Sequence, residues 1–355
     1  MENLNQGAEP VQQPQQIQKP AQPVQQAQPV QAARPAQQAQ PAQAARPAQA
    51  AQPGQNSMRQ PAKRPAQPQA ANIPITVNAC VISHRGCVRE NNEDNFFFNG
   101  DILTDDEVND GATICQQFTK PFHLFAICDG MGGLQGGERA SAICVQSMGM
   151  LNMSMPANSI PRAIDVYADE ACRRVYNDSL EIGEDGREGS TMAMIYMVAG
   201  KGYIGNVGDS RVYLLRMGKL YQLSTDHSMV YQMMQKGQLT REQMRKHPKG
   251  NVIGAYVGMA EDRKPKPYAA HFTVNLCAGD RFMLCSDGLS DLLQHAEMQR
   301  TLAEMKDPRI TAEQLIWRAM EMGGKDNTTV MILDLAANGL PAATAASLAR
   351  LPQER

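Results

Sequence analysis

Residues 125–133 read Phe-Ala-Ile-Cys-Asp-Gly-Met-Gly-Gly, an apolar run that ends in a carboxylate and a cluster of glycines. Four apolar residues are too few for a helix, so we predict a buried strand that reaches the surface at Asp129. The glycines let the backbone turn sharply and bring carbonyl groups close to a bound ion. A simple Asp-Gly turn would explain the same residues.

Two further aspartates stand beside apolar runs. Residues 281–288 read Arg-Phe-Met-Leu-Cys-Ser-Asp-Gly and place Asp287 at a strand end, while Asp326 comes just before the strand-like residues 328–335. Strand ends on one side of a sheet can converge in space, and converging carboxylates repel unless a cation neutralises them. Ligand sets made only of oxygen select hard cations such as Mg²⁺ or Mn²⁺. The sequence therefore predicts a metal cluster.

The first 72 residues differ in composition from the rest of the chain. They are rich in Gln, Pro and Ala, contain no aromatic residue, and repeat the motif of residues 33–37 at 45–49. Such a segment cannot bury enough apolar surface to offset its chain entropy. We expect residues 1–72 to form a disordered arm.

Charge and composition exclude several classes of protein. The arm carries six Lys or Arg and two Glu, which leaves −6 for the remainder of a chain whose total is −2, so neither part has the basic surface of a nucleic-acid-binding protein. The N-terminus is polar, and no apolar run is long enough to span a bilayer. The eight cysteines show no paired spacing and are interpreted as reduced core thiols. We expect a cytoplasmic monomer.

From Ile73 the sequence has the pattern of a globular domain, which we expect to end near residue 335. The predicted elements are a strand at 74–77, an aromatic strand at 96–98, a long hairpin connection over 99–120, amphipathic helices over 137–151 and from 159, and meander strands at 192–198, 212–215 and 220–223. Strands joined by short turns and accompanied by amphipathic helices favour sheets faced by helices.

Residues 226–250 interrupt the β pattern and are predicted to form a helical flap. Residues 226–228 can cap a helix that Gly237 stops, and Thr240 with Gln243 forms a capping box for a second one. A final helix is expected to begin at Thr311, with Gln314 as its capping-box partner. The Ala-rich residues 336–355 are expected to be weakly ordered.

Six motifs in this order resemble those of the metal-dependent serine/threonine phosphatases of the protein phosphatase 2C-like (PPM) family, in their bacterial form. The resemblance covers roughly residues 75–335, and six motifs in sequence are specific although none is decisive alone. It implies an α+β fold, a four-layer α-β-β-α sandwich of two antiparallel sheets flanked by helices. The motifs are Arg89-x-x-Asn92-Glu93-Asp94, residues 129–133, residues 189–191, residues 205–211, residues 286–288, and Asp326-Asn327.

The resemblance also implies a site with two Mn²⁺ or Mg²⁺ ions. Asp129 would bridge both ions, Gly130 would lend its carbonyl, and Asp287 and Asp326 would complete the shell of one ion. Asp94, together with Glu93 through water, would serve the other ion. Arg89 would bind the substrate phosphate with its planar fork of donors. The alternative is a surface arginine paired with Glu90 or Glu93, and the rest of the motif favours the phosphate role.

A third ion is a further expectation. By the resemblance, Asp209 would share this ion with Asp287, and Asp291 is another candidate ligand. A turn locked by hydrogen bonds explains Asp209 equally well, and a carboxylate near a helix N-terminus, such as Asp291, is favourable without a metal. His227 and His247 flank the flap and are assigned no chemical role.

The resemblance implies hydrolysis of phosphoserine and phosphothreonine in proteins by a metal-activated water, in opposition to a bacterial serine/threonine kinase. One alternative is a catalytically weak pseudophosphatase that binds or scaffolds phosphoproteins. A scaffold has no need of a full set of cation ligands, which argues against this reading. Another alternative, a two-metal nuclease, lacks the basic surface that its substrate would require.

Overall fold

The computed structural model describes residues 74–103, 111–132, 136–151, 155–183, 188–250, 252–260 and 269–352. The predicted arm, residues 1–72, lies outside these described ranges, as does Gly133 of the first motif. In the described part of the chain, none of the helices is both long enough and apolar enough to cross a membrane.

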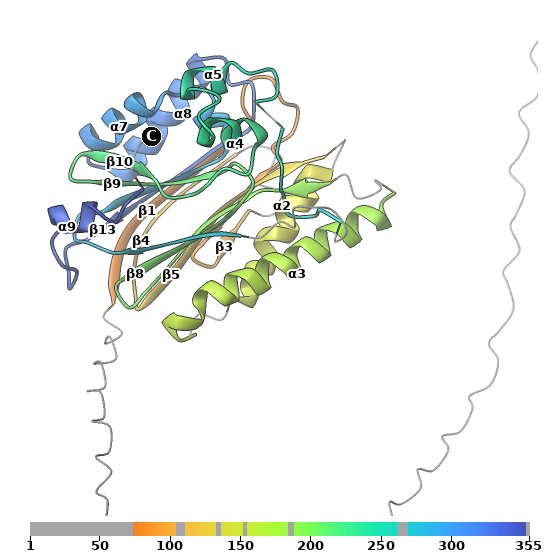
Figure 1. Ribbon diagram of the computed structural model, residues 1–355. Helices are drawn as coiled ribbons and strands as arrows, with labels where there is room; N and C mark the ends of the chain where they lie inside the picture. Colours follow the sequence, from red (N-terminus) through yellow and green to blue (C-terminus); the bar gives the residue numbers. More distant parts are fainter. Residues whose placement is uncertain are drawn as a thin grey trace, which may run out of the picture. The chain divides into compact units, whose positions relative to one another are not determined.

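Two antiparallel sheets form the centre of the domain (Figure 1). In the first sheet the strand order is β10 (Lys219–Gln222), β9 (Arg211–Arg216), β12 (Arg281–Cys285), β13 (Thr328–Leu335), β1 (Ile75–His84) and β4 (Ala112–Lys120). In the second it is β11 (Ala270–Asn275), β8 (Lys201–Val207), β7 (Met192–Val198), β5 (Phe122–Met131), β2 (Asp94–Phe98) and β3 (Asp101–Ile102), with the short β6 (Gly189–Ser190) paired to β5.

Helices cover the outer face of each sheet (Figure 1). Against the second sheet lie α2 (Gly136–Ser147), which continues into the 3₁₀ turn η1 (Met148–Met150), and α3 (Ile160–Glu181), which follows η2 (Ala157–Ser159). Against the first lie α6 (Asp287–Ser290), α7 (His295–Glu304) and α8 (Pro308–Glu321). The flap carries α4 (Met229–Gln235) and α5 (Arg241–Arg245), and α9 (Ala345–Leu348) is near the C-terminus.

Three apolar clusters separate these four layers. Alternate residues of both sheets, such as Val81 of β1 and Ile127 of β5, fill the space between the sheets. The intervening residues face the helices: Leu124 contributes to the cluster under α2 and α3, and Ile82 to the cluster under α8. Strands covered on both faces contain continuous apolar runs, as in Met192–Val198, where every residue is buried. The predicted four-layer sandwich is confirmed.

The flap follows the predicted capping pattern. The Ser228 hydroxyl accepts a hydrogen bond from the Tyr231 N–H at the start of α4, and Thr240 and Gln243 form a reciprocal capping box on α5. Gly237 follows α4 with a positive φ of 71°, a conformation that favours glycine. These local signals are sufficient to set both helices of the flap.

Two elements differ from the prediction. The expected hairpin connection over residues 99–120 is wrong, because it contains β3 and the nine-residue β4, and β4 crosses to the first sheet to pair with β1. The final helix begins at Pro308 rather than at Thr311. Asp307 caps it by accepting hydrogen bonds from the N–H groups of Arg309 and Ile310, and Thr311 lies within its first turn.

Two further expectations are corrected by the packing. Residues 336–355 were expected to be weakly ordered, yet their described part, residues 336–352, contains α9 and places Leu351 in the core between the sheets. In this part the Pro341 carbonyl also accepts a hydrogen bond from the Ala278 N–H. The cysteines are not all reduced, since Cys80 and Cys115 lie opposite each other on β1 and β4 and form a disulfide.

Candidate metal centre

Two of the predicted ligands face each other across a strand pair. Asp94 is the first residue of β2 and is paired in register with Asp129 near the end of β5. The backbone of Asp129 is fixed on its other side, because its carbonyl accepts a hydrogen bond from the Thr191 N–H at 2.8 Å and its N–H donates to the Thr191 hydroxyl at 3.0 Å. The second sheet therefore places two carboxylates side by side at the same end of neighbouring strands.

The other two predicted ligands come from the first sheet. Asp287 follows β12 and begins α6, and Asp326 stands just before β13, the strand next to β12. Hydrogen bonds join this edge to the second sheet, because the hydroxyls of Ser286 and Thr329 donate to Asp94 Oδ2 at 2.8 and 2.7 Å. The structure therefore brings four carboxylates, from two sheets, to the same end of the sandwich.

The pKa values show that these carboxylates act on one another. Burial, followed by the charges of Asp94 and Asp287, raises the pKa of Asp129 well above its usual value. Burial and neighbouring carboxylates likewise raise the pKa of Asp287. Burial raises the pKa of Asp94 to about 6, although the hydrogen bonds from Thr329 and Ser286 lower it. Repulsion within such a set, when it is ionised, is relieved by a cation.

Gly130 is required by close packing. A Cβ atom at this position would lie 2.0 Å from the Gly137 carbonyl oxygen and 2.6 Å from that of Glu93, both backbone atoms that cannot move aside cheaply. Gly130 continues strand β5 rather than forming the sharp turn that we predicted. Its N–H donates to the Glu93 carbonyl at 3.1 Å, so the motif around Asp94 and the motif around Asp129 are locked together.

Arg89 lies beside this edge on an exposed loop. Its Nη2 is 2.8 Å from Asp326 Oδ2, and its Nη1 is 3.7 Å from Glu93 Oε2. The simple ion pair with Glu93 is thus present, but the shorter contact is with a predicted metal ligand. Burial raises the pKa of Glu93 to about 7, against the lowering effect of Arg89.

Three residues that support the site were not predicted from the sequence to have a role. Ser286 and Thr329 hold Asp94 as described above. Asn327 donates through Nδ2 to the carbonyls of Arg85 and Asn91, both at 2.8 Å, and accepts from the Glu93 N–H at 2.9 Å. It therefore fixes the loop that carries Arg89. Asn327 and Ser286 stand inside quoted motifs, so their polar character next to a ligand was an available signal.

The candidates for a third ion surround a small cavity. Asp209, Asp287 and Asp291 line a space of about 40 Å³ together with Arg211 and Asp226. Among the described residues, Asp209 Oδ1 is buried without a hydrogen-bond partner. Burial, then the charges of Asp226 and Asp291, raises the pKa of Asp209 to about 7. A buried carboxylate oxygen of this kind is expected to bind water or a cation.

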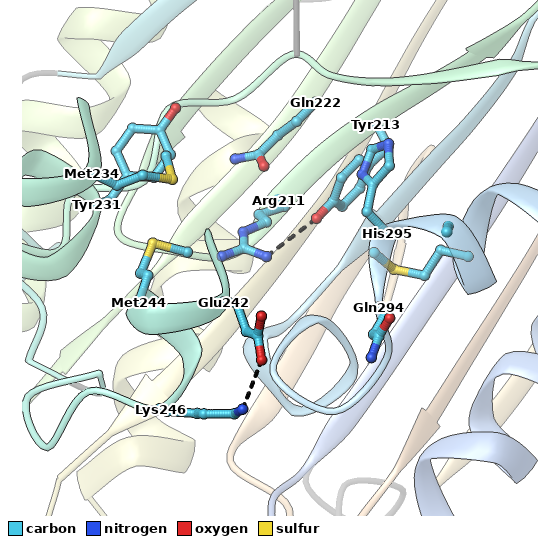
Figure 2. Close-up of a pocket in the computed structure, with 12 residues that line it drawn as sticks. Arg211, Tyr213, Gln222, Tyr231, Met234, Glu242, Met244, Lys246, Gln294 and His295 are labelled. Atoms are coloured by element: carbon cyan, nitrogen blue, oxygen red, sulfur yellow. Dashed lines mark hydrogen bonds and ion pairs between the residues drawn. The ribbon is translucent and has the colours of Figure 1, made fainter. Parts of the chain in front are cut away.

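The flap stands next to this cavity and is separated from the body by a larger one (Figure 2). We call the larger space the flap cavity; its volume is about 490 Å³. His227 ties the start of the flap to the motif around Asp209, because its Nδ1 accepts from the Gly208 N–H at 3.2 Å and its own backbone N–H donates to the Gly208 carbonyl at 2.8 Å.

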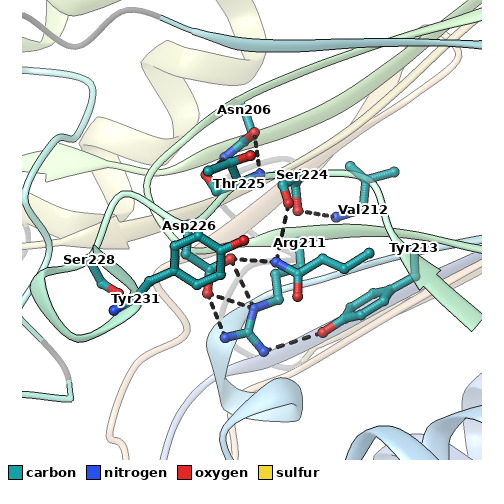
Figure 3. Close-up of polar contacts among 10 residues, drawn as sticks. Asn206, Arg211, Val212, Tyr213, Ser224, Thr225, Asp226, Ser228 and Tyr231 are labelled. Carbon is teal, nitrogen blue, oxygen red and sulfur yellow. Dashed lines mark hydrogen bonds and ion pairs between the residues drawn. The ribbon is translucent and has the colours of Figure 1, made fainter. Parts of the chain in front are cut away.

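A buried ion pair forms the base of the flap (Figure 3). Arg211 Nε donates to both carboxylate oxygens of Asp226, its Nη2 donates to Oδ2 at 2.6 Å, and its Nη1 donates to the Tyr213 hydroxyl at 3.2 Å. The Gln222 amide also donates to Asp226, at 2.7 Å. The Asp226 side chain is only 1% exposed, so this pair rigidly joins β9 to the flap.

The possible ligand atoms at this end of the sandwich are carboxylate and carbonyl oxygens, which fit hard divalent cations. Among the described residues, Asp94 Oδ1 is also buried without a hydrogen-bond partner. The carboxylates are nevertheless spread apart. Within the part of the chain that the structure describes, no three His, Cys, Asp or Glu side chains are grouped closely enough to hold a metal. The contacts of Asp326 with Arg89, and of Asp94 with Ser286 and Thr329, account for this spread.

Comparison with known proteins identifies the family. Residues 103–316 match the family model for protein phosphatase 2C, which is more than half of the chain. The chain belongs to the protein phosphatase 2C family. It is 28% identical over 254 residues to the serine/threonine phosphatase stp of Listeria innocua, an alignment that covers 70% of this chain and 92% of that protein. The predicted family is thereby confirmed.

Solved structures of this phosphatase family have the same fold. The serine/threonine phosphatase PstP/Ppp of Mycobacterium tuberculosis aligns with a TM-score of 0.61 at 28% identity, covering 74% of this chain and 99% of that one. A PstP catalytic domain in complex with two manganese ions aligns with a TM-score of 0.60 at 27% identity, with the same two coverages.

Proposed function

We propose that this chain hydrolyses phosphoserine and phosphothreonine in proteins at a centre that holds two divalent cations, Mn²⁺ or Mg²⁺. The observation that supports this most directly is the meeting of Asp94 and Asp129 from one sheet with Asp287 and Asp326 from the other. The raised pKa values of Asp94, Asp129 and Asp287 are those of a set of carboxylates that favours a bound positive charge. The relatives named as serine/threonine phosphatases favour this chemistry.

The residues take the following roles in the proposal. Asp129 lies between the two groups of ligands and would contact both ions, with the Gly130 carbonyl beside it. Asp287 and Asp326 would hold one ion, and Asp94, with Glu93 through water, the other. Two such cations, when bound, lower the pKa of water and neutralise phosphate oxygens for in-line attack. Because Asp94 is held by two hydroxyl donors, its remaining oxygen is oriented before an ion arrives.

Arg89 would bind the phosphate group of the substrate. It sits on the exposed loop that Asn327 fixes, and its guanidinium is already directed at the carboxylate edge by Asp326. With Asp326 engaged as a metal ligand, the Arg89 guanidinium would be free of that contact, and its planar pair of donors suits two phosphate oxygens. A third and weaker ion would be shared by Asp209, Asp287 and Asp291 around the small cavity.

The substrates would be phosphoproteins supplied by a serine/threonine kinase, in the cytoplasm, with the enzyme acting as a monomer. The runner-up is a pseudophosphatase that binds phosphoproteins without turnover. The spread of the ligands and the Arg89–Asp326 ion pair are the observations that favour it.

The experiment compares a phosphothreonine peptide with a single-stranded oligonucleotide as substrates, with Mn²⁺, with Mg²⁺ and after EDTA. We expect hydrolysis of the peptide only, lost on chelation and restored by the ion. Mn²⁺ binding is measured by calorimetry alongside, and Asp287→Asn should weaken it independently of any activity. Peptide binding without phosphate release, in the presence of bound Mn²⁺, would establish the pseudophosphatase instead.

A further inference from the structure

The flap cavity is a space next to the carboxylate site that the proposed chemistry does not use. The flap contributes side chains from α4 and α5 on one side, and β9, β10 and the start of α7 contribute them on the other (Figure 2). Its volume of about 490 Å³ lies within the range of ligand-binding pockets. The lining residues that matter here are Arg211, Gln222, Tyr231, Met234, Met244 and Gln294.

The apolar part of the flap cavity is lined by flexible methionine side chains and by aromatic rings. Met234 and Met244 reach into it from the two flap helices, and Tyr231 and Tyr213 add ring surface. Met298 of α7 also lines it. Methionine is flexible and polarizable, and it packs favourably against aromatic rings. This lining suits an aromatic or long aliphatic side chain whose identity varies from one partner to the next.

Arg211, Lys246 and Glu242, which line the flap cavity, are each paired with a residue of opposite charge. The Arg211 guanidinium is matched by Asp226, and Lys246 Nζ is 2.8 Å from Glu242 Oε1. An anionic ligand would therefore gain little here. The remaining polar groups are suited to amides. Gln294 can donate and accept, whereas Gln222 offers its carbonyl as an acceptor because its amide nitrogen already donates to the Ser224 carbonyl and to Asp226. Arg211 Nη1 donates to Tyr213 with only one of its two hydrogens among the described contacts.

The flap cavity adjoins the carboxylate site. Arg211 and Met244 line both the flap cavity and the small cavity that contains Asp209 and Asp287. These two side chains therefore form a wall that the two cavities share. A chain segment that places a phosphate at the carboxylates can therefore lay a neighbouring residue in the flap cavity, since successive residues advance by roughly 3.3–3.6 Å.

We propose that the flap cavity is a docking subsite for the substrate protein, one that takes an aromatic or long aliphatic side chain near the phosphorylated residue and binds its flanking backbone amides. This inference rests on the proposed phosphatase function and names a feature of its substrates. The soft lining, the balanced charge, the amide-matching groups and the wall shared with the carboxylate site all favour a peptide over an anion.

The test uses the full chain with Mn²⁺ and a set of phosphothreonine peptides that are identical except for one phenylalanine, moved from four residues before the phosphothreonine to four residues after it, with alanine elsewhere. Met234→Trp fills the flap cavity and Met234→Ala removes part of its lining. Met233→Ala is the matched control, because Met233 precedes Met234 on α4 and does not line the cavity. Para-nitrophenyl phosphate, which has no peptide, reports the chemistry alone.

We expect phenylalanine at one or two positions to raise kcat/KM about tenfold over the all-alanine peptide, which is the size of effect that one well-packed apolar group produces. Both Met234 variants should reduce this preference to less than about twofold, while Met233→Ala keeps it and all four proteins hydrolyse para-nitrophenyl phosphate equally. N-acetyl-tryptophanamide should inhibit hydrolysis of the preferred peptide competitively and leave para-nitrophenyl phosphate turnover unchanged.

Two results would overturn the docking proposal while leaving the phosphatase function intact: turnover of para-nitrophenyl phosphate with no preferred phenylalanine position, or a preference that survives Met234→Trp. Inhibition of both substrates by N-acetyl-tryptophanamide would also overturn it, because the flap cavity would then be an effector site. Loss of both substrates with Mn²⁺ present would instead reject the phosphatase function, and the docking subsite with it.

Discussion

Asp209 makes the metal-free protein less stable as the pH rises, and Asp209→Asn should remove this dependence. Burial and the charges of Asp226 and Asp291 raise the pKa of Asp209 from 3.8 to about 7 in the folded chain. Between these two values the folded state binds more protons at this group than the unfolded state does. The free energy of unfolding therefore falls as pH rises from about 4 to about 7, and is constant with respect to this group above that.

The magnitude follows from the size of the shift. A change of about 3 pKa units at roughly 1.36 kcal/mol each amounts to about 4 kcal/mol, of which about 3 kcal/mol is lost between about pH 4.5 and about pH 7.5. Asparagine keeps the shape of the side chain and carries no charge. Between those two pH values, the EDTA-treated wild type should lose about 3 kcal/mol more stability than EDTA-treated Asp209→Asn does.

The assay is equilibrium urea unfolding of both proteins in EDTA at the two pH values, followed by circular dichroism. The comparison is a difference between two proteins, so every group that does not interact with Asp209 cancels. Asp287 and Asp129, whose pKa values are raised by the charge of Asp209, respond to the substitution and contribute to the measured difference. Asp169→Asn is the control, because Asp169 is exposed on α3 and outside the carboxylate cluster. Equal pH dependence of wild type and Asp209→Asn, or a wild type that gains stability relative to the variant as pH rises, would refute the reasoning.

Three further predictions concern packing and the arm. Arg216 and Asp280 form an ion pair in which both side chains are 1% exposed, so Arg216→Met should destabilise the fold by about 3–5 kcal/mol in urea unfolding, and adding Asp280→Leu should recover most of this loss. Gly130→Ala should abolish Mn²⁺ binding and turnover. Gly149→Ala should change neither, because a Cβ atom at residue 149 meets open space. A Gly130→Ala protein with normal Mn²⁺ affinity would contradict the packing argument. Deleting residues 1–72 should leave the melting temperature and peptide turnover nearly unchanged, and a large drop in melting temperature would show that the arm docks on the domain.

The strands with both faces covered were the easiest elements to predict. Residues 192–198 and 282–285 are continuous apolar runs, and such a run has few alternatives to a buried strand. The flap helices were equally accessible, because their caps are local signals within three or four residues of each other.

The edge strand β4 could not be recognised from its own residues. Most of Ala112–Lys120 is exposed or half-buried, Phe118 is its one buried residue, and its pairing partner β1 lies about 30 positions earlier. Exposed edge strands lack the apolar alternation on which a sequence prediction depends.

The predicted start of α8 was wrong for a different reason. Asp307 followed by Pro308 indicates a helix start as strongly as the predicted capping box of Thr311 and Gln314 does. The two possible starts lie within four residues of each other.

The sequence identified the candidate ligand residues but could not predict how they are arranged in space. That Asp94 and Asp129 stand opposite each other depends on the register of β2 against β5, which is a long-range property. Ser286 and Thr329 were missed as partners of Asp94 for the same reason, since they belong to the other sheet. Ser286 at least stands beside Asp287 in a quoted motif, but hydroxyl groups in buried strands are common, and nothing within the sequence separates Thr329 from the rest.

The arrangement of these partners indicates how metal binding and folding are linked. The four carboxylates sit on two sheets whose packing is driven by the apolar cluster between them, so burial of that cluster forces the charges together. Hydrogen bonds to Asp94 and the ion pair between Arg89 and Asp326 offset part of the resulting repulsion and hold the ligands slightly apart. Under the proposed function, binding of a cation to the folded chain would displace Arg89 from Asp326, so the same event would stabilise the fold and free the guanidinium for the phosphate. The metal-free domain is therefore expected to fold, at some electrostatic cost, in a state in which its phosphate-binding arginine is still occupied.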